Sequence, residues 1–443
     1  MINEYYQLTM SPCINRYFND LGNLFFFIFI IILSLITLRS FVLKFAKEND
    51  KNILLFNKIK ISYHEPKILY FIFFYHLAFT IVNIFFSDCG EMSSPFPVTP
   101  NDANSLYINA GYYFSEIRFT LGSNFYSYIL YPFVSILKIS FLNINLLFSS
   151  LSFFGMLFFY SITKNYIYKN NSNLFLFLII LLILPNFHYW TSYLTKEVLI
   201  FSFLSFYLFY IFSEKDNYKI KITLFILFLL CFGVRPYFGL VFIISHVIAF
   251  IYVKIIQKEF SLKILSIFLI ILFATYFIFV NVYWKSNYQG VGGLIDIPSN
   301  LFYFMDQRFR ATMTGYSFNE HIGYFFHFIY YYFAPLHFPT EFNLRNSIVF
   351  LNNLILMFVF LILVAHIIYN YKYFNRALAL IFKNKNKKIF RIGLLLFLIS
   401  FTFALSNSVA NFGIIMRQKE SIMFLIYFYL ICINSNILYI KGK

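Results

Sequence analysis

Charged side chains are scarce in this chain. Asp, Glu, Lys and Arg make up 12% of its 443 residues, whereas hydrophobic residues make up 60% and aromatic residues 24%. Soluble domains usually carry about 25% charged residues. A water-soluble fold of this size cannot bury so much apolar surface, and the hydrophobic runs recur along the whole chain. This composition excludes an ordinary soluble enzyme and predicts a membrane protein.

Acidic residues are scarcer still. There are 18 of them against 35 basic residues, which gives a net charge of +17. In a soluble protein this excess indicates nucleic-acid binding. In a membrane protein Lys and Arg collect in the cytoplasmic loops, and that explanation is sufficient here, so we expect membrane lipids and no nucleic acid as partners.

Cysteine is also rare, with four residues and no CxxC pair. The spacing excludes zinc-ribbon and thioredoxin-like sites. A Cys13–Cys89 disulfide requires that both residues lie outside the membrane, whereas Cys231 and Cys432 lie in apolar runs and suit packing. The first apolar run, 21–42, is followed by no small-residue cleavage site, so we expect a transmembrane helix and no cleaved signal peptide.

Motifs for nucleotide, dinucleotide or metal binding are missing. The sequence contains no Walker loop, and no GxGxxG, HExxH or GxSxG motif in a suitable context. ATP-driven transport and soluble-cofactor chemistry are therefore disfavoured. We expect no cofactor and a metal-independent mechanism.

Apolar segments long enough to cross a bilayer fill most of the chain. A spanning helix needs about 20 apolar residues. We predict an all-α, polytopic integral membrane helix bundle over 1–443, with roughly eleven or twelve transmembrane helices. The candidate spans are 21–42, 68–87, 125–143, 145–163, 173–189, 197–213, 222–234, 237–253, 263–283, 347–370, 392–407 and 421–440.

Basic loops orient these spans. The breaks 43–67 and 371–391 are rich in Lys and Arg and are predicted to be cytoplasmic. The segments outside are then 88–124 (the first external loop), 188–196, 284–346 (the large external loop) and 408–420, together with the Arg235-Pro236 turn. If 88–124 lies outside and 164–172 lies in the cytoplasm, the chain must cross the membrane an odd number of times between them, but two apolar runs lie there. One of the two runs 125–143 and 145–163 is therefore re-entrant or interfacial, or 164–172 lies outside.

Three cations and one acid stand at predicted span ends. Lys196 and Glu197 open a predicted helix, where Glu suits the helix dipole and Lys can meet a phosphate. Arg235 lies between two apolar runs with no acid nearby in sequence. Its guanidinium can bind phosphate oxygens in a bidentate way, or it can extend to the lipid headgroups. Arg417 lies on the predicted outer side, against the usual charge bias, which favours a phosphate ligand.

The external loops supply further candidates. Asp102 begins a helix-like run, where it can be an N-cap or a general base for a sugar hydroxyl. In the large loop, Arg308 and Arg310 can bind pyrophosphate. His321 can accept a proton near neutral pH, although a loop histidine is more often simply solvated.

Three segments resemble a pattern found in bacterial surface-polysaccharide proteins. They are LPNFHYWTSYLTKE at 184–197, VRPYFGL at 234–240 and NFGIIMRQKESIMF at 411–424. The pattern is similar to that of O-antigen and capsule polymerases, which are related to the GT-C glycosyltransferases. The matching positions are Lys196, Glu197, Arg235, Arg417 and Asn411, and Asp102 parallels the first-loop carboxylate of GT-C enzymes.

The resemblance implies an enzyme that polymerises undecaprenyl-pyrophosphate-linked repeat units at the periplasmic face of a bacterial inner membrane. It allows a chain-length regulator protein as a further partner. Two alternatives stay open. One is a transferase that adds a single sugar from a polyprenyl-phosphate donor, and the other is a flippase for the same lipid-linked glycans.

Overall fold

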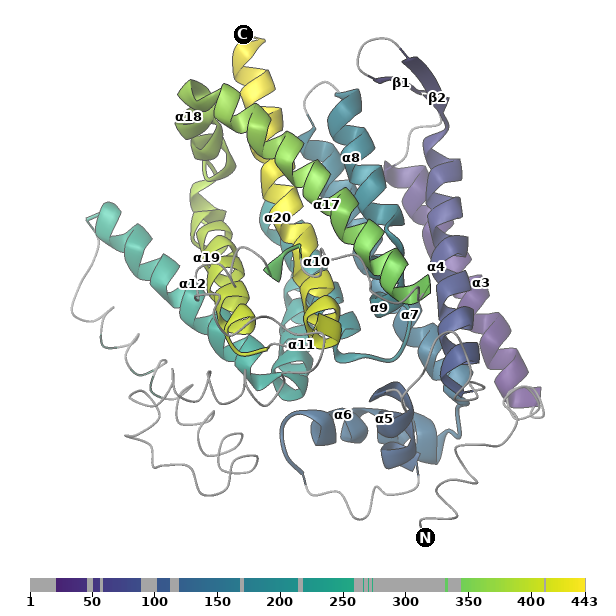
Figure 1. Ribbon diagram of the computed structural model, residues 1–443. Coiled ribbons are helices and arrows are strands. Elements are labelled where there is room, and N and C mark those ends of the chain that lie inside the picture. The colour runs from purple at the N-terminus through teal and green to yellow at the C-terminus, as the bar shows by residue number, and fades with distance from the viewer. Residues whose placement is uncertain are drawn as a thin grey trace. The chain divides into compact units, whose positions relative to one another are not determined.

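The computed structural model describes residues 21–45, 51–55, 59–88, 102–111, 119–167, 171–213, 218–258, 331–333, 344–409 and 412–442, together with 266, 270 and 273. Apart from one two-stranded hairpin, the regular elements among them are helices (Figure 1). The predicted all-α polytopic membrane bundle is confirmed, since seven of the described helices are long and apolar enough to cross a membrane. An eighth crossing is possible where two short helices meet at a bend.

The described residues form two compact units. The first consists of Met1–Phe119, Tyr126–Phe206 and His337–Asn352, and the second of Thr120–Phe125, Tyr207–Leu336 and Asn353–Lys443. The single domain expected over 1–443 stays a prediction. Helices α6, α10 and α17 each contribute residues to both units.

Unit 1 is a group of apolar helices in which α7 packs against both α3 and α4. Its elements are α3 (Leu21–Phe45), β1 (Lys51–Leu55), β2 (Ile59–Tyr63), α4 (Glu65–Asp88), α5 (Asp102–Gly111), α6 (Ser123–Tyr131, from Tyr126 onward), the π-helix η2 (Pro132–Ile136), α7 (Phe141–Tyr166), α8 (Ser172–Ile183), α9 (Pro185–Thr191), the first part of α10 (Lys196–Phe212) and the first part of α17 (Leu344–Tyr369). The antiparallel β1–β2 pair joins α3 to α4, in register from Lys51 opposite Tyr63 to Leu55 opposite Ile59.

Two predicted spans of unit 1 have a different form. The span expected at 125–143 is instead the short helix α6 followed by η2, because Pro132 interrupts the regular pattern and the chain leaves the helix at Leu137. This identifies 125–143, rather than 145–163, as the run that does not cross as one straight helix. The span expected at 173–189 is the pair α8 and α9, bent by 46° at Leu184.

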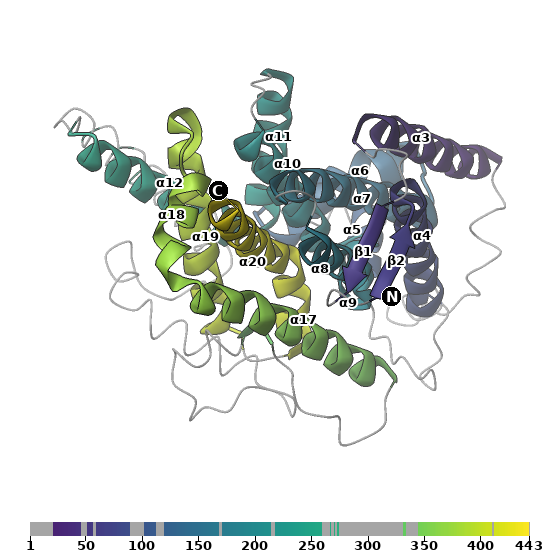
Figure 2. The ribbon, with the colours of Figure 1, turned by 90° about the horizontal axis from the view of Figure 1, so that it is seen from above.

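Unit 2 is built around two antiparallel helices. Its elements are α11 (Tyr218–Val234), α12 (Pro236–Ile256), α17 (Leu344–Tyr369, from Asn353 onward), α18 (Tyr371–Ile381), the 3-10 turn η5 (Lys385–Lys387), α19 (Lys388–Ser406) and α20 (Phe412–Lys441). Helices α12 and α19 lie side by side in both views (Figures 1 and 2). Phe238 contacts Phe401 near one end of the pair, and His246 contacts Phe390 toward the other.

Basic residues gather at one end of unit 2. The Nζ of Lys387 donates to the carbonyls of Tyr210 and Ser213 at 2.7 Å each, and Nε of Arg391 donates to the carbonyl of Ile211 at 3.1 Å. These carbonyls end α10, where a helix has no partners of its own and favours cations. Lys254, Lys383 and Lys441 lie at the same end, since α12 and α20 end where α19 begins.

This arrangement predicts the sidedness of α20. A reporter enzyme that is active only outside the cytoplasm should be active when fused after Asn407 and inactive when fused after Lys443, because a single helix separates the two points and Lys and Arg mark the second side as cytoplasmic. A fusion after Asn384 is the control and should also be inactive. Equal activity after Asn407 and Lys443, or the reverse order, would show that this orientation is wrong.

Candidate functional site

The turn that carries Lys196 and Glu197 follows a break in the helical path of unit 1. Helix α8 ends at Ile183, Leu184 is extended, and Pro185 occupies the first position of α9. Proline lacks an N–H and clashes with the preceding turn, so it begins a helix more easily than it continues one. The chain therefore bends here, and α9 is followed by four non-helical residues, Ser192 to Thr195.

Side chains from neighbouring helices hold this irregular backbone. Asn83 on α4 donates to the carbonyl of Tyr189 and to the hydroxyl of Ser192, both at 2.9 Å. The Oδ1 of Asn145 on α7 accepts from the backbone N–H of Leu194 at 2.7 Å. Non-helical backbone at membrane depth persists only where protein groups satisfy its hydrogen bonds. These hydrogen bonds therefore hold the turn in a fixed conformation.

Lys196 and Glu197 are the first two residues of α10, as the sequence predicts. Glu197 is buried, with 1% of its surface exposed, and Lys196 is partly exposed. An acid in the first turn is favoured by the helix dipole, so the position of Glu197 has a structural explanation as well as a chemical one. Their roles as base and phosphate ligand stay predictions.

Arg235 occupies the tight connection between α11 and α12 in unit 2. Gly233 is required just before it, because a Cβ at that position would lie 2.1 Å from the ring of Phe125. The carbonyl of Gly233 also accepts from the N–H of Gly122 at 2.7 Å. Arg235 itself is 6% exposed, donates to the hydroxyl of Tyr237 and lies 5.8 Å from the centre of that ring.

The first turns of α20 hold a second group of charges. Arg417 is partly exposed, whereas Lys419 is fully buried. The Nζ of Lys419 donates to Oδ1 of Asn353 at 2.8 Å and to the carbonyl of Tyr332 at 3.3 Å. Glu420, the next residue, is 3% exposed, and its Oε1 accepts no hydrogen bond.

Arg235 and the start of α20 lie at the same end of unit 2. The ring of Tyr237 stacks on Phe401 at 5.9 Å, close to the end of α19 at Ser406. A short connection then leads to α20 at Phe412, so the start of α20 is at this end too (Figure 1). This is the end opposite to the basic residues Lys387 and Arg391. We name the set Arg235, Arg417, Lys419 and Glu420 the charged end.

The remaining predicted residues are only partly described. Asp102 is the first residue of α5, as expected, but its side chain lies outside the described residues. Arg308, Arg310 and His321 also lie outside them, as do most of the large loop 284–346 and the Cys13–Cys89 pair. Within the described part of the chain no group of three or more His, Cys, Asp or Glu side chains can hold a metal ion.

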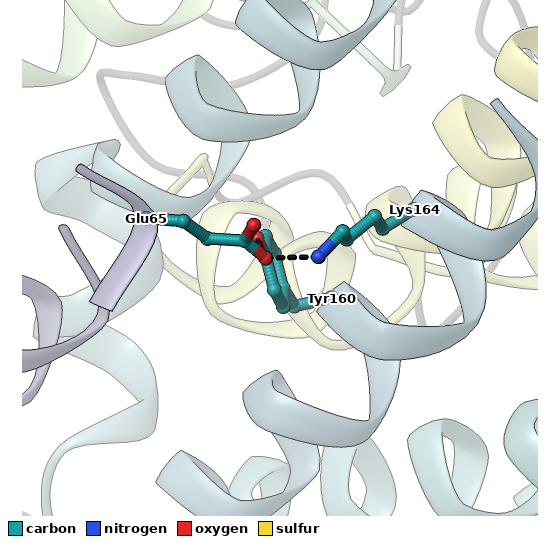
Figure 3. Close-up of polar contacts among 3 residues, drawn as sticks. All are labelled: Glu65, Tyr160 and Lys164. Atoms are coloured by element: carbon teal, nitrogen blue, oxygen red, sulfur yellow. Dashed lines mark hydrogen bonds and ion pairs between the residues drawn. The ribbon is translucent and has the colours of Figure 1, made fainter. Parts of the chain in front are cut away.

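One buried ion pair in unit 1 is structural. Glu65, at the start of α4, is 1% exposed, and its Oε1 accepts from the hydroxyl of Tyr160 and from Nζ of Lys164, both on α7 (Figure 3). A buried carboxylate with both a cation and a hydroxyl donor is satisfied within the protein. The pair fastens α4 to α7, and nothing in its geometry calls for a ligand.

Sequence reasoning missed the burial of Lys419 and Glu420. The signal that could have identified them is the KE pair inside an otherwise apolar run, since charges persist in spanning helices where they are paired or functional. No protein-family model, curated protein or solved structure matches this chain.

The buried charges of α20 predict a large stability effect. Lys419→Met should lower the free energy of unfolding by about 3–5 kcal/mol, because it leaves Glu420 buried without its neighbouring cation and Asn353 without a donor. Chemical unfolding of the purified protein in detergent micelles measures the change.

The double variant K419M/E420Q provides the control. It removes both charges together, so it should recover a part of the lost stability. An unchanged stability in K419M alone, or a larger loss in the double variant, would show that the two residues do not act as a buried pair.

Proposed function

We propose that this membrane protein polymerises glycans carried on undecaprenyl pyrophosphate, at the non-cytoplasmic face of a bacterial inner membrane. The observation that carries the proposal is the charged end of unit 2. There, Arg235, Arg417 and Lys419 lie opposite the Lys- and Arg-rich end that marks the cytoplasm. Cations are costly inside a membrane helix bundle, and they are retained where an anion or a function requires them.

The reaction needs positive charge at the place where the pyrophosphate leaves. The hydroxyl oxygen of the acceptor attacks the anomeric carbon of the donor glycan, and the bond from that carbon to the pyrophosphate oxygen breaks. The pyrophosphate departs with the bonding electron pair, and a base takes the hydroxyl proton. Guanidinium and ammonium groups placed where this charge develops lower the barrier without a metal ion.

The residues divide between these tasks. Arg235 and Arg417, both in unit 2, are proposed to bind the pyrophosphate of the donor, and Lys196, Arg308 and Arg310 stay predicted phosphate ligands. Glu197, Asp102 and His321 are the candidates for the base that receives the hydroxyl proton. Support for this division comes from the resemblance of the segments around Lys196, Arg235 and Arg417 to polysaccharide polymerases, and from the burial of Glu197 and Arg235.

The test is product formation by purified protein in liposomes supplied with an undecaprenyl-pyrophosphate-linked oligosaccharide. The wild-type protein should give a ladder of long products, and Arg235→Ala or Arg417→Ala should reduce the rate on the order of 10²-fold, as expected for loss of one group that stabilises developing charge. Electrophoresis of the labelled glycan separates the products by length.

Arg376→Ala is the matched control, since Arg376 is exposed on α18 at the opposite end of unit 2. It should leave the ladder unchanged. Long products at the normal rate from both R235A and R417A would overturn the proposal. A single sugar added from a polyprenyl-phosphate donor would identify the alternative transferase, and lipid-linked glycan crossing the bilayer unchanged would identify a flippase.

A further inference from the structure

Two buried histidines face each other in unit 1, away from the residues assigned above to glycan transfer. His76 lies on α4 and is 2% exposed, and His188 lies on α9 and is fully buried. Their Nδ1 atoms are 2.9 Å apart, a hydrogen-bond distance, so one of the two atoms carries a hydrogen and the other accepts it.

The second nitrogen of His188 decides which atom donates. Its Nε2 lies 2.6 Å from the carbonyl oxygen of Leu182. A carbonyl only accepts, so Nε2 of His188 must carry a hydrogen. In a neutral ring Nδ1 of His188 is then the acceptor. The hydrogen between the two rings therefore belongs to Nδ1 of His76.

The second nitrogen of His76 meets two oxygens on α7. Its Nε2 is 3.0 Å from the hydroxyl oxygen of Ser152 and 3.3 Å from the carbonyl of Ser149. The hydroxyl of Ser152 also lies 2.5 Å from the carbonyl of Thr191, at the end of α9, and it has a single hydrogen to give.

Two proton arrangements are consistent with these distances. With two neutral rings, Ser152 must donate to Nε2 of His76, and the carbonyl of Thr191 then faces the hydroxyl without a hydrogen between them. With one more proton, Nε2 of His76 donates to Ser152, and Ser152 donates to Thr191. The hydroxyl oxygen of Ser152 also lies 2.8 Å from the carbonyl of Ser149. Only the second arrangement offers a hydrogen to both carbonyls, from Ser152 to Thr191 and from Nε2 of His76 to Ser149, and a buried group left unsatisfied costs about 1–3 kcal/mol.

We propose that His76 and His188 form a proton-binding site inside the membrane-embedded part of unit 1. The pair takes up one proton beyond those of two neutral rings, so that Nε2 of both rings carries a hydrogen and the two Nδ1 atoms share one. In step with this, the hydroxyl hydrogen of Ser152 moves from Nε2 of His76 to the carbonyl of Thr191. The ligand is a proton, and its loss reverses both changes.

The surroundings of the pair both disfavour and favour the charged imidazolium ring. Burial disfavours the imidazolium, because no water solvates it. Hydrogen bonds to Ser152, Ser149 and His188 favour it, and the ring of Tyr75, 4.7 Å from that of His188, adds an aromatic neighbour. A small cavity, lined mostly by hydrophobic side chains, borders the site, and its polar lining residues are His76, Ser34, Ser149 and Ser150.

The other titratable groups on the surrounding elements are few. On α4 and α9 the nearest are Tyr75 and Tyr189, next to the two histidines in sequence, and α4 also carries Lys67, Tyr70 and Asp88 farther along the helix. Glu65 and Lys164, on α4 and α7, bind each other three turns of helix away from the pair. On α3, which also lines the cavity, Arg39 and Lys44 lie beyond Ser34. The described parts of α3, α4, α7, α8 and α9 thus bring no carboxylate against the pair.

Proton binding is linked to the turn before Lys196. Thr191 is the last residue of α9, and Ser152 donates to its carbonyl when the pair holds the added proton. The site is thereby coupled to the backbone at Ser192–Thr195, the turn held by Asn83 and Asn145. This coupling is independent of which reaction the protein performs.

The experiment is 15N NMR of the full-length protein with 15N-labelled histidine, in lipid nanodiscs and without any glycan substrate. Imidazolium and the two neutral tautomers have distinct 15N shifts. An imidazolium signal should grow as the pH falls from about 8 to about 5. It should correlate through space with a second imidazole, and it should be absent from both His76→Gln and His188→Gln.

His246→Gln is the matched control. The Nδ1 of His246 donates to the carbonyl of Phe242 at 2.8 Å, and its Nε2 lies 2.6 Å from the hydroxyl of Tyr207, which can donate. A neutral His246 is therefore fully bonded, and its removal should leave the imidazolium signal unchanged. The chain has eight histidines, so the signal of the pair is identified by its correlation with a second imidazole. The absence, in the wild-type protein, of any imidazolium signal with that correlation throughout the pH range would overturn the proposal even where a variant fails to fold.

Discussion

The absence of water around membrane helices is the constraint on which the rest of this structure depends. A polar side chain buried there must bond to another protein group, because the lipid offers it nothing. Glu65 has Lys164 and Tyr160, Lys419 has Asn353, and His76 has His188 and Ser152. Each of these contacts joins two elements, so the polar residues also determine how the apolar helices pair.

Because of the same constraint, positive charge has a different use at each end of unit 2. At one end Lys387 and Arg391 satisfy the last carbonyls of α10, which is a structural use of positive charge. At the other end Arg235 is buried at the start of α12, where the dipole disfavours a cation, and Lys419 is buried two turns into α20. A helix start attracts anions instead, so the start of α12 adds to the attraction that we propose Arg235 exerts on a phosphate group.

Much of the fold could be predicted from hydropathy alone. The runs 21–42 and 347–370 correspond closely to α3 and α17, because long apolar segments have few alternatives to a spanning helix. The run 125–143 was wrong as a straight span, because hydropathy does not register the interruption at Pro132. Hydropathy also did not predict the bend at Leu184, although a proline such as Pro185 indicates a helix boundary.

The candidate site was less predictable, because its partners are distant in sequence. Arg235 and Glu197 were identifiable as ionisable residues at span ends. The contact of Lys419 with Asn353 joins residues 66 apart, and that of His76 with His188 joins residues 112 apart. A lone histidine in an apolar run gives no indication of its partner, so neither pair could be inferred from spacing.

The central claim is that the charged end of unit 2 binds a phosphorylated lipid carrier. Its most direct test is a binding measurement with lipids that carry no sugar. We predict that the purified protein binds undecaprenyl pyrophosphate at least about tenfold more tightly than undecaprenol, a difference of about 1.4 kcal/mol, and that the preference disappears in an R235A/R417A double variant. Equal affinity of the wild-type protein for the two lipids would contradict the claim.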